Sequence, residues 1–202
     1  SLTIGAWSLI LVYEDRVNLT SKKLYYYQGF ELNEGQNRRL FPSGFDAPPD
    51  PEVDLTIMIL EGDEGIAGDQ LNVNGRQVSD NCNPANNVFN STVNTGGDCR
   101  RGVQGVDLDR FSIARAIDVG DDEAEIELVI PRGDGLLTPG EQLFTNWMIL
   151  AFDHLLPDFE SFKPEKEAIP RAGTVVRPGD VISYQIRIAN DGSAAATGVV
   201  LT

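Results

Sequence analysis

The chain has 202 residues, with 31 Asp and Glu against 16 Lys and Arg, which gives a formal net charge of −15. This charge argues against a nucleic-acid partner, because binding to phosphates needs clustered Lys and Arg. It also disfavours adsorption to anionic lipid, and the absence of any run of about 20 apolar residues argues against membrane insertion.

Short apolar or alternating runs, separated by Gly, Asn, Asp and Pro, predict an all-β protein. In chain order the predicted strands of the first unit are residues 6–13, 24–30, 53–60, 70–73, 124–130 and 142–152. The first of them, AWSLILVY, is apolar enough to be a buried strand. Residues 111–119 fit either a short helical turn or a strand. Because no clear amphipathic helix is present, the pattern favours a β-sandwich or a jelly roll.

Both cysteines lie in residues 61–111, between apolar strands. Cys82 and Cys99 flank a loop that is rich in Asn, Gly, Ser and Thr, and no second pair of metal ligands accompanies them. This arrangement predicts a disulfide and hence an exported, extracellular protein. The loop-entropy estimate gives such a crosslink roughly 3 kcal/mol of stabilisation.

The same stretch contains candidate ligands for a cation. Asp63, Asp69, Asp107 and Asp109 supply carboxylates, and several Asn side chains supply neutral oxygens. Calcium prefers oxygen ligands in flexible loops, so calcium is the expected ion if one is bound. The alternative is that these residues are only turn formers, because Asp, Asn and Gly dominate turns for local reasons. No EF-hand consensus is present, and both interpretations remain open.

The composition changes after residue 160. We predict a β-sandwich domain at residues 1–160, a linker at 161–178 and part of a second domain at 179–202. Alternation of Ile182, Tyr184, Ile186 and Ile188 indicates one strand, and Val199, Val200, Leu201 and Thr202 indicate the start of another. So few residues cannot bury the core of an immunoglobulin-like domain of about 100 residues, so this segment is expected to be incomplete.

The C-terminal stretch PGDVISYQIRIANDGSAAATGVVLT combines a Gly-Asp turn, a Tyr-containing strand, Asn-x-Gly and a small-residue run before a Val-rich strand. It resembles the opening of the "conserved repeat" domain, a domain of unknown function in large bacterial and archaeal surface proteins. The resemblance implies an immunoglobulin-like β-sandwich, usually repeated in tandem on adhesins and cell-wall proteins.

The elements GAWSLILVYED, YYQGF, EGD…GD, NPANNVFNST and GVDLDRF resemble a secreted module that often precedes such repeats. That module brings no established activity. Its pattern usually has a strand and a turn before the Ala-Trp-Ser element, whereas here only a few residues precede it. We therefore expect a processed chain or a fragment whose first strand is missing.

Two functions follow as hypotheses. The first is an extracellular structural or adhesive cell-surface protein, joined to other copies or to neighbouring surface-protein domains by β-strand addition, with a filament as one outcome. The second is a carbohydrate-binding or carbohydrate-cleaving module with a glycan as its partner, based on Trp7, Trp147, the tyrosines and the abundant carboxylates.

The sequence lacks the residues that other classes of enzyme need for catalysis. His154 is the only histidine, and no G-x-S-x-G element, Walker motif or dinucleotide-binding glycine motif occurs. A zinc site based on histidine lacks ligands. We therefore predict no catalytic residues, although a glycosidase needs only two suitably spaced carboxylates and stays open.

Overall fold

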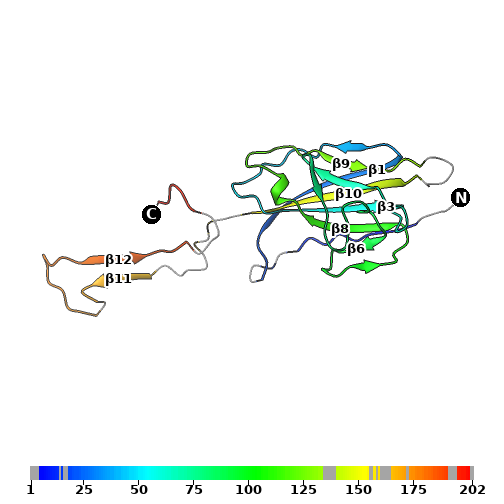
Figure 1. Ribbon diagram of the computed structural model, residues 1–202. Coiled ribbons are helices and arrows are strands. Elements are labelled where there is room, and N and C mark those ends of the chain that lie inside the picture. Colours follow the sequence, from blue (N-terminus) through cyan, green and yellow to red (C-terminus); the bar gives the residue numbers. More distant parts are fainter. Residues whose placement is uncertain are drawn as a thin grey trace. The chain divides into compact units, whose positions relative to one another are not determined.

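The computed structural model describes residues 5–13, 15, 18–133, 140–154, 157, 159, 165–171, 173–190 and 195–200. The protein divides into two units, Ser1–Asp153 and His154–Thr202. The predicted all-β class is confirmed: within the described residues the only helical element is a 3-10 turn, η1 (Ala114–Ala116) (Figure 1). No helix in this part of the chain has the length and apolar character needed to cross a bilayer.

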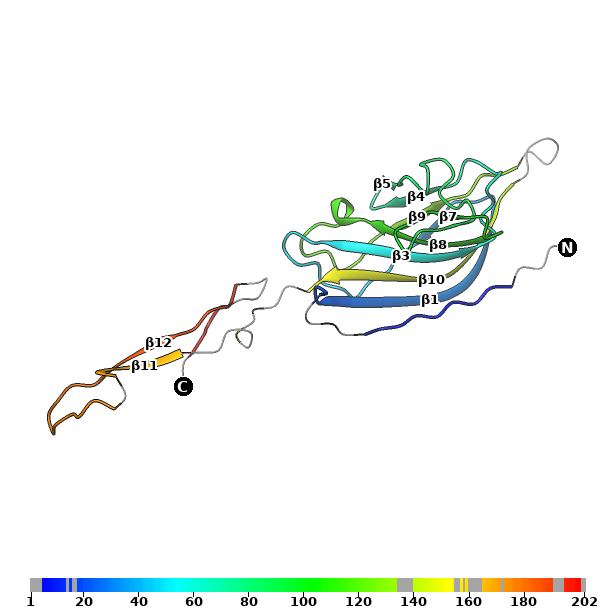
Figure 2. The same ribbon diagram turned by 90° about the horizontal axis from the view of Figure 1, so that it is seen from below.

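Unit 1 contains two sheets that face each other (Figure 2). In spatial order the six-stranded sheet consists of β1 (Lys22–Glu34), β10 (Gln142–Asp153), β3 (Val53–Leu60), β8 (Val106–Ser112), β6 (Thr92–Val93) and β7 (Arg100–Arg101). The four-stranded sheet consists of β2 (Arg38–Leu40), β9 (Ile126–Val129), β4 (Gln70–Val73) and β5 (Arg76–Val78). Neighbouring strands are antiparallel except β6 and β8, which are parallel.

The core lies between the two sheets because each long strand turns one set of alternate side chains inward. On β3, Leu55, Ile57 and Ile59 are buried in the main apolar cluster, together with Leu128 of β9 and Leu150 of β10. Met58 and Leu60, on the opposite face of β3, pack with Trp147 in a second, smaller apolar cluster. Residues 57–60 of this strand are therefore buried on both faces, which explains their unbroken apolar sequence, Ile-Met-Ile-Leu.

β1 and β10 are both irregular at the same place. Their register shifts between Gln28 and Glu31 on β1, and the register of β10 with β3 shifts between Thr145 and Trp147. Tyr25 and Tyr27 pack against the main core, whereas Tyr26 is exposed and its ring lies beside Trp147. The tyrosines therefore alternate between the two faces of the sheet, as side chains on a strand do.

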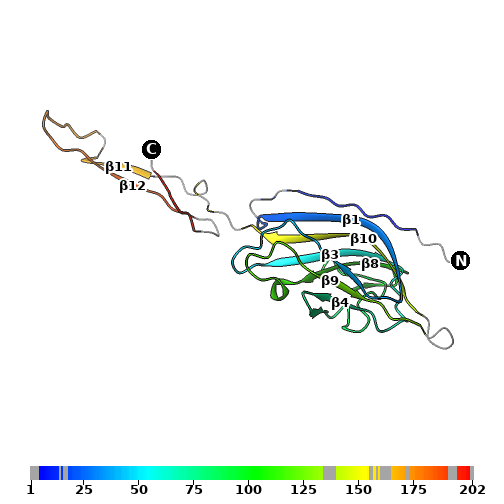
Figure 3. The same cartoon turned by 90° about the horizontal axis from the view of Figure 1, so that it is seen from above.

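The prediction of a buried strand at residues 6–13 is wrong. These residues form no strand and are exposed, with Trp7 at 87%. The segment runs beside β1 in Figures 2 and 3, and the Nε1 atom of Trp147 donates a hydrogen bond of 3.0 Å to the hydroxyl of Ser8. Apolar composition supplies only the side chains that a buried strand needs. Such a strand also needs neighbours that pair with its backbone, and here that pairing is missing.

Unit 2 contains a two-stranded antiparallel hairpin of β11 (Glu165–Ile169) and β12 (Ser183–Arg187). β11 falls inside the predicted linker, so that part of the linker is a strand because β12 offers it a backbone partner. Val199 and Val200 are exposed and belong to no strand within the described residues, contrary to the prediction. Leu201 and Thr202 lie outside the described residues. The boundary between the units follows Asp153, slightly before the predicted domain boundary at residue 160.

Candidate cation site

Three buried carboxylates are anchored on two loops of unit 1. Asp69 and Asp107 are fully buried and Glu141 is 1% exposed. Asp107 lies on the inward face of β8, opposite Ile59 of β3, where an apolar residue would be expected. Asp69 comes directly before β4, and Glu141 comes directly before β10. Three separate elements therefore bring acidic side chains into the interior.

Each of these carboxylates is held by one of its two oxygens. Asp69 Oδ2 accepts a hydrogen bond of 2.7 Å from the Phe89 N–H, and Asp107 Oδ1 accepts one of 3.2 Å from the Thr92 N–H. Glu141 Oε1 accepts one of 3.2 Å from the Asp63 N–H. The second oxygen of each is buried and has no hydrogen-bond partner, which is rare for a buried polar atom.

The loops that hold these side chains approach each other closely at Gly62. The Ser91 hydroxyl donates a 2.6 Å hydrogen bond to the Gly62 carbonyl and accepts one of 2.9 Å from the Gly105 N–H. Glu61 and Ser91 both have positive φ angles, 69° and 58°, which non-glycine residues rarely adopt. Such strained backbone persists only where the surroundings fix it, and it often marks functional sites.

The electrostatic environment disfavours the ionised form of these three acids. Burial, with the Asp69 charge as the next contribution, raises the pKa of Glu141 to about 9. Burial and the Asp109 charge raise the pKa of Asp107 to about 8, and burial raises the pKa of Asp69 to about 6. Every charged neighbour that contributes to these shifts is acidic. A carboxylate in such a place must be protonated or accompanied by a cation.

Asp109 lies next to these three carboxylates but is not one of them. It shares the inward face of β8 with Asp107, as the Asp-x-Asp spacing predicts for a strand. Both of its oxygens are buried without a hydrogen bond of normal geometry. Burial raises its pKa to about 7, although the nearby Asn83 side chain acts in the opposite direction. Asp80, which also raises this pKa, is occupied by hydrogen bonds from the Cys82 and Asn83 N–H groups and the Asn94 side chain.

The structure thus brings together two of the four predicted ligands, Asp69 and Asp107, and places Asp109 beside them. Asp63 is exposed and contributes its backbone N–H, not its carboxylate, to the contacts described here. Glu141 was not predicted, because it lies far along the chain in a Gly-Glu-Gln turn with no neighbouring acid. Its position directly before an apolar strand is the only signal in the sequence that could have found it.

The predicted disulfide is confirmed: Cys82 and Cys99 are joined, with their Cα atoms 5.3 Å apart. It closes the loop that carries Phe89 and Thr92, whose N–H groups hold Asp69 and Asp107. The same loop is tied to Cys82 by Asn90, whose Nδ2 donates a 3.0 Å hydrogen bond to the Cys82 carbonyl. The crosslink therefore fixes the scaffold of the carboxylates.

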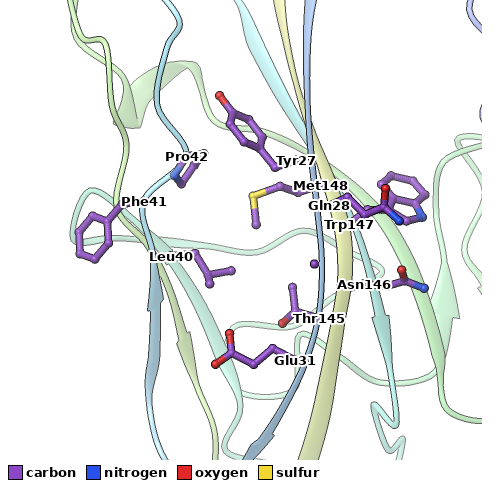
Figure 4. Close-up of a pocket in the computed structure, with 11 residues that line it drawn as sticks. Tyr27, Gln28, Glu31, Leu40, Phe41, Pro42, Thr145, Asn146, Trp147 and Met148 are labelled. Atoms are coloured by element: carbon purple, nitrogen blue, oxygen red, sulfur yellow. The ribbon is translucent and has the colours of Figure 1, made fainter.

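A pocket of about 220 Å³ lies where β1 and β10 are irregular (Figure 4). It is smaller than the ligand pockets of about 300–1,000 Å³ that are common in proteins. Figure 4 shows the Trp147 side chain on the opposite side of the strands from Tyr27 and Met148, so its ring forms no platform for a sugar here. Among the described residues, Glu31 is the only acidic one that lines the pocket, and it pairs with Arg38 at 2.9 Å. A glycosidase needs two carboxylates across the bond it cleaves, and this pocket supplies one.

Comparison with known proteins gives no relative for this chain. No protein-family model, no curated protein and no solved structure matches it. The interpretation of the site therefore depends on its geometry alone.

Gly62 provides a first test of the packing at this site. A Cβ atom at Gly62 would lie 2.0 Å from Asp107 Oδ2 and 2.9 Å from the Phe89 carbonyl oxygen. We expect Gly62→Ala to lower the free energy of unfolding by about 1–3 kcal/mol, as overpacking of a filled interior does. Urea denaturation measures this. Gly65→Ala is the matched control, because a Cβ there meets nothing within 4 Å, and an equal loss in both variants would contradict the prediction.

Proposed function

We propose that the protein is an extracellular structural or adhesive component of a cell surface, and that β-strand addition at unit 2 joins it to neighbouring copies in a filament. The observation that carries this proposal is the β11–β12 hairpin. Every residue of β12 is exposed, including Tyr184 at 58% and Ile186 at 50%. A hairpin of two strands is at best marginally stable in water, and independent stability needs further strands or a covered apolar face.

The hairpin has the chemistry that strand addition requires. Its outer backbone edges can pair with another strand, and its exposed Ile182, Tyr184, Ile186 and Ile188 can be covered by an added layer. Its only ring contact in the described residues is the Lys166 ammonium, 4.5 Å from the centroid of the Tyr184 ring. A contact of this kind between two different surfaces need not close into a ring, so repeated addition would produce a filament.

Two further features support an extracellular surface protein. The Cys82–Cys99 disulfide is typical of oxidising compartments. The sequence from residue 178 onward resembles the opening of a repeat domain of bacterial and archaeal surface proteins, in which such segments belong to immunoglobulin-like sandwiches. The resemblance supports a role as one module in a row of modules.

The test is to disrupt β12 without touching unit 1. Ile186→Pro removes a backbone N–H from the strand and introduces a ring that a paired strand does not accommodate. We expect the unaltered protein to form filaments in negative-stain electron micrographs and the variant to remain monomeric by light scattering. Val175→Pro is the matched control, since Val175 is exposed and lies outside the strands. Filaments in the Ile186→Pro variant, or a monomeric unaltered protein at high concentration, would contradict the proposal.

A further inference from the structure

Unit 1 contains a group of buried acids with no counterion among its described residues. Asp69, Asp107 and Glu141 are buried, and none of the ion pairs described for this protein involves them. The acids that act on them are Asp63 and Asp109, so neighbouring side chains add negative charge. Uncompensated charges are expensive in an interior, and a chain that keeps several of them together needs something that neutralises them.

We propose that Asp69, Asp107 and Glu141 bind one calcium ion at the junction of the loops around Gly62 and Phe89–Thr92. The pattern that points to an ion is the same for all three carboxylates: one oxygen accepts a backbone N–H from these loops and the other is buried without a partner. The second oxygen of each carboxylate is buried and keeps its lone pairs free for a metal. The hydrogen bonds also hold the ligands in place before the ion arrives.

A neutral oxygen in the same loop strengthens the argument. Asn90 is 3% exposed and its Oδ1 atom is buried without a hydrogen bond, although its Nδ2 atom is used. Asp107 Oδ2 and the Phe89 carbonyl oxygen both face Gly62, where the absence of a side chain leaves room for them. Amide and carbonyl oxygens beside carboxylates are the usual mixture around calcium, which takes six to eight oxygen ligands.

The chemistry of these ligands selects the ion. All of them are oxygens, so zinc and copper, which favour nitrogen and sulfur ligands, should bind weakly here. They come from three separate elements and two loops, an adaptable arrangement that suits calcium better than the strict octahedron of magnesium. In the described residues no three His, Cys, Asp or Glu side chains are grouped as a finished metal shell. The ion would complete the shell by drawing the unpartnered oxygens of the three anchored carboxylates toward it.

The experiment uses the full chain stripped of metal with EDTA. Isothermal titration calorimetry with calcium chloride should give a stoichiometry near one. The melting temperature should rise by about 5–10 °C when calcium reaches roughly 100 times its dissociation constant. Magnesium chloride at the same concentration serves as the comparison. No calcium binding, or an equal shift with both salts, would overturn the proposal.

Variants separate this site from other acids on the protein. Asp107→Asn and Glu141→Gln keep the shape of each side chain and remove a charge, so each should lower calcium affinity at least tenfold. Neither should lower the melting temperature in EDTA, because each relieves repulsion. Asp122→Asn, at an exposed position, should bind calcium like the unaltered protein. If one variant fails to fold, the other still tests the site. Unchanged calcium affinity in a folded variant would overturn the assignment of that carboxylate as a ligand.

Discussion

In calcium-free buffer the protein should become less stable as the pH rises from 5 to 8. The cause is the set of buried acids whose pKa values are raised by burial: about 6 for Asp69, about 8 for Asp107, about 7 for Asp109 and about 9 for Glu141. Most proteins behave differently in this range, because their carboxylates are stabilised as anions in the folded state.

The direction follows from the protons held by each state. Near pH 4 the unfolded chain begins to release protons from these carboxyls, whereas the folded protein keeps them until the pH passes their raised values. Between about pH 4 and pH 9 the folded state therefore holds more protons than the unfolded state. The free energy of unfolding falls with increasing pH over that window, and it is largest at its acidic end.

Thermal melting in EDTA, followed by circular dichroism between pH 5 and 8, measures the effect. One pKa unit for one group corresponds to about 1.4 kcal/mol, and about 1 kcal/mol moves the melting temperature by roughly 2–4 °C for a chain of this size. We therefore expect a decrease of at least about 5 °C. The double variant Asp107→Asn/Glu141→Gln should have a much flatter profile, whereas Asp122→Asn should keep the original slope. A melting temperature that rises between pH 5 and 8 would contradict the prediction.

Much of unit 1 follows from local sequence signals. Residues 53–60 and 70–73 form strands with the predicted bounds, because a mostly apolar run and a short alternating run each satisfy strand geometry on their own. The strand at 142–152 extends by one residue to Asp153. The disulfide could also be predicted, because only one pair of cysteines is available.

Other elements depend on partners that the sequence does not reveal. β8 starts at Val106 with two acids at inward positions, so its sequence resembles a polar loop and only its C-terminal end fits the pattern of a strand. β11 has the sequence EKEAI, which is typical of a helix or a linker, and it becomes a strand by pairing with β12. In contrast, the strongly apolar segment at residues 6–13 pairs with no strand among the described residues and stays exposed.

The candidate site divides in the same way. Asp69 stands out in the sequence because it lies among glycines and asparagines, and Asp107 stands out through its Asp-x-Asp spacing with Asp109. Glu141 joins them only through the antiparallel path of β10, which brings its N-terminal end to the loop at Asp63. On each carboxylate one oxygen is anchored and the other has no partner. This feature depends on the conformation of the loops, so the residue types alone do not reveal it.

Removal of the disulfide should have the second large effect. We expect the double variant Cys82→Ser/Cys99→Ser to lose about 3 kcal/mol of stability, because an open loop of 17 residues regains conformational freedom in the unfolded chain. The crosslink lies between Asp80, whose carboxylate caps the turn at Cys82, and β7, which pairs with β6. Its loss should therefore loosen β6 and β7 before it disturbs the core strands β3 and β10.

Loop order and ion binding should be linked in this variant. The N–H groups of Phe89 and Thr92, which hold Asp69 and Asp107, lie inside the loop that the disulfide closes. A loosened loop must be ordered again when calcium binds, and that cost lowers the affinity. Urea denaturation with and without calcium measures both effects, and the unaltered protein treated with a reducing agent should behave like the double variant. Full calcium affinity in the double variant would mean that the loop is ordered without its crosslink. Unchanged stability would mean that the disulfide does not constrain the unfolded chain as expected.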